Sequence, residues 1–132
     1  MTSKKEKKSS VPERMVAFQQ LLEGLVAVNV EFLKRHRKLT GKSYPSLYDI
    51  APKYRGPADF GMWQDISFTA ETGAGDACDL VCWRVAELRA QGYEDVHPFV
   101  KMTRTDDGSF FTTVQVRIRD LIEDPTAILG NV

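Results

Sequence analysis

The chain has 132 residues, of which 42% are hydrophobic and 27% are charged. This length suits one domain with its own core, and this composition excludes a disordered chain. No uninterrupted apolar run approaches the roughly 18 residues of a membrane span, and the first ten residues lack the apolar segment of a secretory signal, so we expect a protein made in the cytoplasm.

The formal net charge of zero hides a basic tail. The four lysines of this tail are Lys4, Lys5, Lys7 and Lys8. With only one glutamate beside them, they leave 14 basic and 17 acidic residues for the rest of the chain. Such a tail could contact nucleic acid, but a solvated, disordered leader is the simpler interpretation. We expect a disordered tail over residues 1–10 and one domain over residues 11–132.

Residues 9–41 show the pattern of one long helix. Ser10, Pro12 and Glu13 form a helix-start signal, with a capping box and a proline in the first turn. Apolar residues then recur at helical spacing. Basic residues gather before Gly41, where they favour the helix dipole. The basic cluster "KRHRK" could suggest nucleic-acid binding, but its position at a helix end explains it more simply.

Residues 42–72 contain three prolines and several aromatic residues but no sustained period. We expect an ordered segment without secondary structure of its own, wrapped over the core by aromatic anchors. A second helix is predicted from Ala77 to Gln91, closed by Gly92. Residues 95–105 and 109–119 then read as two strands joined by an Asp107-Gly108 turn. The last twelve residues begin extended, turn at Asp124-Pro125 and close with a helical turn.

The stretch "GAGDACDLVCW", residues 73–83, is typical of the entry to a catalytic helix. In papain-like and transglutaminase-like sites a cysteine lies at a helix N-terminus, a histidine lies on the next strand, and an acid orients that histidine. Cys78 and Cys82 are expected to be free thiols, because a spacing of four suits a shared helix face better than a disulfide.

A series of short motif pieces follows in one order along most of the chain after the tail: Leu47-Tyr48, Tyr54-Arg55, Trp63-Gln64-Asp65-Ile66, Gly75-Asp76, Asp79-Leu80, Cys82-Trp83-Arg84, Glu87-Leu88-Arg89 and Glu123-Asp124-Pro125-Thr126. In these pieces and their order the chain resembles short transglutaminase-like proteins of bacteriophages and prophages.

Under this resemblance the catalytic positions are substituted. Ala77 aligns with the catalytic cysteine and Thr113 with the catalytic histidine, whereas Asp124 matches the orienting acid. A methyl group forms no covalent intermediate, and a threonine hydroxyl is no base near neutral pH. Asp124 also has a structural interpretation, since an Asp-Pro step favours a turn and its carboxylate can accept from nearby N–H groups.

One rescue is a displaced triad of Cys78, His97 and Asp124. It is disfavoured, because one residue along a helix turns the side chain by about 100°. Two cysteines and His97 would supply at most three ligands without zinc-site spacing, so neither a metal nor a cofactor is expected. The candidate binding residues are Tyr48, Tyr54, Trp63, Asp65 and Trp83, although packing explains the last three as well.

We therefore expect an α+β fold, in which a long N-terminal helix and a central helix pack on an antiparallel sheet of three or four strands. The resemblance implies a transglutaminase-like core. The expected function is a catalytically degenerate virion protein that contacts other particle proteins or itself. One alternative is a cysteine hydrolase or acyltransferase that uses Cys78. Another is a small regulatory protein that grips a peptide in the degenerate groove.

Overall fold

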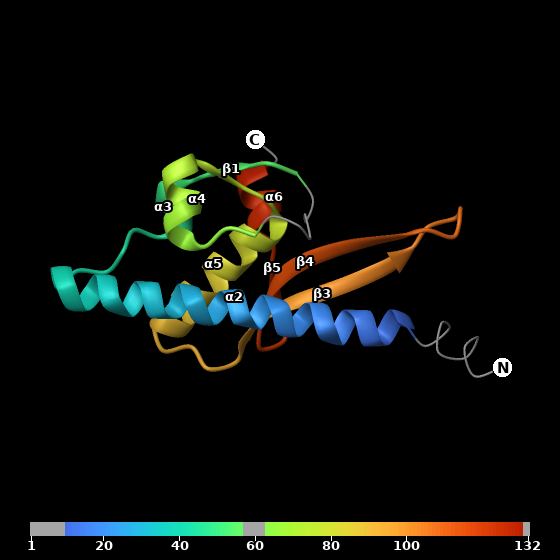
Figure 1. Ribbon diagram of the computed structural model, residues 1–132, viewed down its shortest axis with the longest axis horizontal. Coiled ribbons are helices and arrows are strands. Elements are labelled where there is room, and N and C mark those ends of the chain that lie inside the picture. Colours follow the sequence, from blue (N-terminus) through green and yellow to red (C-terminus); the bar gives the residue numbers. More distant parts are fainter. Residues whose placement is uncertain (1–9, 57–62, 131–132) are drawn as a thin grey trace.

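The computed structural model describes residues 10–56 and 63–130, and it combines helices with a small antiparallel sheet, as the sequence predicts. The predicted basic tail lies outside the described residues. Figure 1 shows a long helix lying across the molecule, a central helix behind it, and a two-stranded hairpin that extends to one side.

The long helix α2 (Ser10–Thr40) confirms the first predicted element. One face of α2 is buried at helical spacing and belongs to the core, through Phe18, Leu22, Val26, Asn29 and Leu33. The helix ends where Gly41 takes a φ of 73°, a left-handed conformation that favours glycine. The predicted capping box involves the side chain of Ser10, which lies outside what the structure describes.

By length and composition α2 could also cross a membrane, which the sequence reading did not anticipate. Residues 15–32 include only two charged side chains, Glu23 and Glu31. One stripe of α2 packs into the core of this domain, but only 28% of its most apolar stretch is buried. The apolar composition of α2 also reflects its outer face, on which large hydrophobic side chains are exposed to solvent.

The central helix α5 (Ala77–Ala90) is buried on almost every side, with eleven of its 14 residues in the interior. It begins with a reciprocal capping box between Asp76 and Asp79, and it ends at Gln91 and Gly92, whose φ is 105°. Both ends agree with the predicted bounds. A helix that is buried on almost every side has to be enclosed by other elements, and α5 packs against α2, the sheet and the C-terminal helix.

The sheet has three antiparallel strands in the order β3 (Val96–Arg104), β4 (Phe110–Ile118) and β5 (Leu121–Glu123). Val96 pairs with Ile118 and Arg104 with Phe110, so the hairpin is in register along its whole length. Buried valines on one face of β3 and β4 join the core with α2 and α5. The hairpin confirms the two strands and the turn that the sequence predicts.

The prediction for residues 42–72 was wrong, because this segment has secondary structure of its own. It contains α3 (Leu47–Ile50), β1 (Lys53–Tyr54) and α4 (Ile66–Thr72), and β1 pairs in parallel with β2 (Ala74–Gly75). Ser46 caps α3 and Asp65 caps α4 through their side-chain oxygens. Helices of one or two turns are too short to show a period in the sequence, so only their caps could have revealed them.

Candidate functional site

The N-terminus of α5 is held by a buried network centred on Asp79. The Asp79 carboxylate accepts from the backbone N–H of Asp76 (3.0 Å) and of Gln64 (2.7 Å), and Arg55 lies 3.4 Å from it. Burial raises the pKa of Asp79 to about 6, and the neighbouring Asp76 charge adds to this, while the two hydrogen bonds and Arg55 act in the opposite direction. The segment before α4 and the start of α5 are therefore locked together.

Ala77 occupies the first turn of this helix, where its methyl group is almost fully buried. Cys78, one residue later, is completely buried. Burial raises the pKa of the Cys78 thiol far above its usual range, and the charges of Asp76 and Asp79 add to the effect. A reactive cysteine needs a stabilised thiolate, and this environment favours the neutral thiol.

Cys82 is also free and completely buried, and its Sγ lies 3.6 Å from the carbonyl oxygen of Leu22. Burial raises its pKa as well. Both cysteines therefore have the surroundings of small core residues.

Asp124 caps the C-terminal helix α6 (Pro125–Gly130). Its Oδ1 accepts from the Thr126 hydroxyl (2.6 Å) and from the backbone N–H groups of Thr126 (3.1 Å) and Ala127 (3.3 Å). These bonds and one from Gln115 lower the pKa of Asp124, although burial opposes them. These contacts show the structural role that the Asp-Pro step suggested, in which the Asp124 carboxylate accepts from nearby N–H groups.

From β4, Asp124 is contacted by Gln115, whose Nε2 donates to the Asp124 Oδ2 over 3.2 Å. Thr113 lies two residues away on β4, and its hydroxyl donates to the carbonyl of Lys101 over 3.4 Å. Of Thr113 and Gln115, it is Gln115 that contacts Asp124. Gln115 therefore occupies the place that a base oriented by Asp124 would take. Gln115 was not among the candidate residues that the sequence suggested. An amide does not titrate near neutral pH, so this position also lacks a base.

His97 belongs to a different cluster, at the opposite end of β3 from the hairpin turn. Its ring nitrogens lie 3.2 Å from Arg89 and 3.1 Å from Asp95. Arg89 in turn donates to both carboxylate oxygens of Glu23 on α2, at 2.8 and 3.1 Å. Among the described contacts, none joins His97 to Cys78 or Asp124, and the displaced triad is not assembled.

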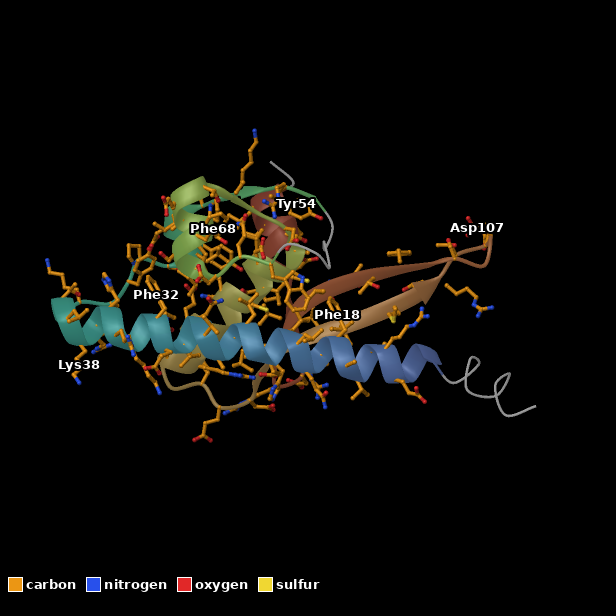
Figure 2. The ribbon with its side chains drawn as sticks, in the orientation of Figure 1. Phe18, Phe32, Lys38, Tyr54, Phe68 and Asp107 are labelled. Atoms are coloured by element: carbon orange, nitrogen blue, oxygen red, sulfur yellow. The ribbon has the colours of Figure 1, made fainter. Side chains whose placement is uncertain are left out.

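Several of the matched motif pieces meet in a second network, around Arg84; Figure 2 shows the described side chains of the whole domain. The Arg84 guanidinium donates to Glu123 over 2.7 Å and to Glu87 over 2.6 Å, and it lies 4.9 Å from the ring centre of Tyr48. The Tyr48 hydroxyl donates to Glu123 over 2.5 Å. Glu87 also accepts from the backbone N–H of Leu47 over 2.9 Å. Residues 47–48, 84–87 and 123 thus form a framework that joins three parts of the chain.

Two of the five candidate binding residues share a groove. Tyr48 and Tyr54 line an open hollow of about 630 Å³ between β1 and α6, together with Ile128 and Leu129. Burial raises the pKa of Tyr54, and the charges of Asp124 and Asp76 add to it.

The other three candidates have structural positions. Trp83 is fully buried, which corrects its place among contact residues, because it has no surface to offer a partner. Asp65 accepts from the Phe68 N–H (2.9 Å) as the cap of α4. Trp63 is half-buried against Phe18, with ring centres 5.7 Å apart, and its indole N–H has no acceptor among the described residues.

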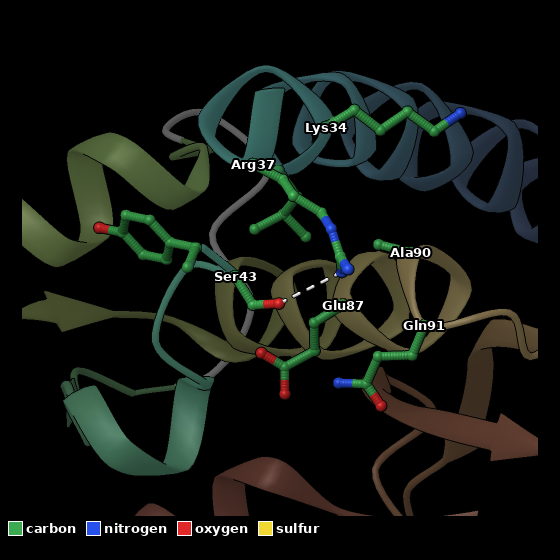
Figure 3. A pocket seen from close by; sticks show the side chains of 8 residues that line it. Lys34, Arg37, Ser43, Glu87, Ala90 and Gln91 are labelled. Atoms are coloured by element: carbon green, nitrogen blue, oxygen red, sulfur yellow. Dashed lines mark hydrogen bonds between the residues drawn. The ribbon is translucent and has the colours of Figure 1, made fainter. Parts of the chain in front are cut away.

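A smaller pocket of about 90 Å³ lies where the end of α2 meets the end of α5 (Figure 3). Lys34 and Arg37 of α2 are on one side of it, and Glu87 and Gln91 of α5 are on the other. Arg37 donates to the hydroxyl of Ser43 over 3.4 Å, and Glu87 is already satisfied by Ser46, Leu47 and Arg84. Because Arg37 and Glu87 are engaged within the domain, this pocket is a weak candidate for a ligand.

Over residues 10–56 and 63–130, no three histidine, cysteine, aspartate or glutamate side chains are grouped so that they could hold a metal ion. No protein-family model, no curated protein and no solved structure matches this chain.

Proposed function

We propose that this chain is a catalytically inactive domain with a transglutaminase-like core, which serves as a structural or adaptor component of a phage or phage-derived particle. The observation that carries the proposal is the start of α5. Its capping box is intact, but the side chain that would attack a substrate is the methyl group of Ala77. The positions around it offer no substitute, because Cys78 is buried and Gln115 faces Asp124.

The loss of chemistry contrasts with the intact framework. The residues that give the resemblance include Tyr48, Arg84, Glu87 and Glu123, and these hold the fold together rather than forming a site. A protein that keeps such a framework without a nucleophile or a base is one that still needs its shape. The particle context comes from the resemblance in the motif pieces. Analogy of this kind transfers fold better than function, so the particle role needs a test of its own.

The groove of Tyr48 and Tyr54 is the surface that we assign to partner contacts. Its rim includes Ile128, a large apolar side chain that is 54% exposed. An apolar rim around a concave surface with two tyrosine rings has the composition of protein interfaces. The alternative of an enzyme acting through Cys78 has no support from these contacts.

Quantitative mass spectrometry of particles purified from the encoding organism tests the proposal. We expect the chain in a fixed ratio to the other particle proteins. Ile128→Asp should lower this ratio, whereas Asp49→Ala, at an exposed position of α3 outside the groove, should leave it unchanged. A chain that is absent from purified particles and remains in the free protein pool would contradict the particle role. A native protein that hydrolyses or transfers amide bonds would contradict the loss of catalysis.

A further inference from the structure

The outer face of α2 carries a regular seam that no other described element covers. Figure 1 shows α2 at the front of the molecule with nothing drawn over it. The exposed residues of this seam follow one another at spacings of three and four, and they are Arg14, Ala17, Leu21, Gly24, Val28 and Glu31. Alternating spacings of three and four are those of a coiled-coil seam, whose residues meet a facing helix. The core residues Leu22, Val26 and Leu33 lie on the opposite side of α2.

We propose that two copies of this chain pair through this seam, with their α2 helices antiparallel and related by a twofold axis between Leu21 and Gly24. In this register Arg14 of each copy meets Glu31 of the other, and Ala17 meets Val28. Leu21 meets Gly24, where the structure has open space: a Cβ built on Gly24 has no atom within 4 Å. A large side chain facing an empty position is the knob-into-hole contact of a helix pair.

Charge and size select the antiparallel arrangement. In a parallel pair each residue would face its own copy, so Arg14 would repel Arg14, and Leu21 would press against Leu21. In the antiparallel pair both ends carry opposite charges, and the large residues alternate with small ones. A surface that complements itself in this way satisfies the condition for a twofold dimer.

Large apolar side chains of the seam are exposed in the single chain, and a second copy would cover them. Leu21 is 60% exposed and Val28 is 53% exposed, although Leu25 and Val30 of the same helix pack against the core. Contact along about five turns of one helix falls below the roughly 1,200 Å² of a standard interface, so the dimer should dissociate on dilution. The pairing does not depend on the particle role, because it concerns the purified chain alone.

Sedimentation equilibrium over a hundredfold range of concentration tests the pairing, with a charge swap as the diagnostic variant. We expect Arg14→Glu and Glu31→Arg each to lower the association constant by about tenfold, because each places like charges together at both ends of the pair. Combining the two substitutions should restore association. The internal Glu31–Arg35 pair (3.6 Å) is highly exposed on both sides, so its loss should not unfold the monomer, which circular dichroism would verify.

A leucine pair provides the matched control. Leu21→Lys should abolish association, whereas Leu39→Lys, at an 84% exposed position outside the seam, should leave it unchanged. A protein that stays monomeric throughout, or a dimer that ignores both the charge swap and Leu21→Lys, would overturn the proposal. Sedimentation of the monomer with neutral lipid vesicles, lost in Leu21→Lys, would assign the seam to a membrane surface and overturn it as well.

Discussion

Replacement of Arg84 by methionine should destabilise the domain far more than its surface position on α5 suggests. The Arg84 side chain is 18% exposed, and it joins Glu87 and Glu123, which are 7% and 22% exposed, through bonds of 2.6 and 2.7 Å. Methionine keeps the length and the apolar stem but leaves two carboxylates without their cation. Breaking a buried pair by removing one partner costs about 3–5 kcal/mol, and partial exposure places Arg84 near the lower end, at about 3 kcal/mol.

Urea unfolding followed by circular dichroism measures this difference as a shift of the midpoint at constant slope. Arg35→Met is the matched control, because Arg35 pairs with Glu31 at 3.6 Å while both side chains remain largely in water. The control should cost less than about 0.5 kcal/mol. If Arg84→Met cost no more than the control, the framework would contribute nothing to stability. The conclusion that the motif residues were kept for the fold would then fail.

Three further predictions concern α5 and its glycine neighbours. The pKa of Asp79 is raised from 3.8 to about 6, so the folded state holds this proton more tightly than the unfolded state does. The free energy of unfolding should therefore fall as the pH rises from 5 to 7. Asp79→Asn should remove this slope, which urea titrations at several pH values would measure. In a Cys82→Ser variant, Cys78 should react with iodoacetamide only at the rate of unfolding. A labelling rate of the folded protein that reaches its plateau at a pH below the usual thiol pKa of about 8.5 would instead show an accessible thiolate. Gly75→Ala should cost about 1–3 kcal/mol, because the added methyl would lie 3.0 Å from the Asp79 Cβ. Gly24→Ala, in open space within a helix of the single chain, should raise the melting temperature at concentrations where the protein is monomeric.

Much of the fold is readable from the sequence because its long elements carry strong local signals. The stripe of α2, the cap at Asp76 and Gly92, and the Asp107-Gly108 turn are each set by neighbours within a few residues. The short helices α3 and α4 escaped this reading although Ser46 and Asp65 were visible as caps. A cap followed by fewer than eight residues predicts a turn as well as it predicts a helix.

The candidate site is harder to predict, because it depends on which residues of distant strands meet. The sequence shows that Ala77 begins a helix, but the choice between Thr113 and Gln115 depends on the register of β4 against β5. That register pairs Val116 with Glu123, and so brings Gln115 next to Asp124. Since shifting a strand by one residue exchanges its two faces, a count along the chain cannot settle such a contact.

The hairpin has a consequence for how the domain opens. Burial along β3 and β4 stops at Val100 and Val114, and beyond this point the described side chains up to the turn are at least partly exposed. The outer half of the hairpin is therefore held by its ladder and by few core contacts. Its amide hydrogens should exchange with solvent through local fraying, at a free energy well below that of global unfolding. The amide of Val116, which is buried in the central strand of the sheet, should instead exchange only when the whole domain unfolds, so one continuous hairpin would contain two different exchange regimes.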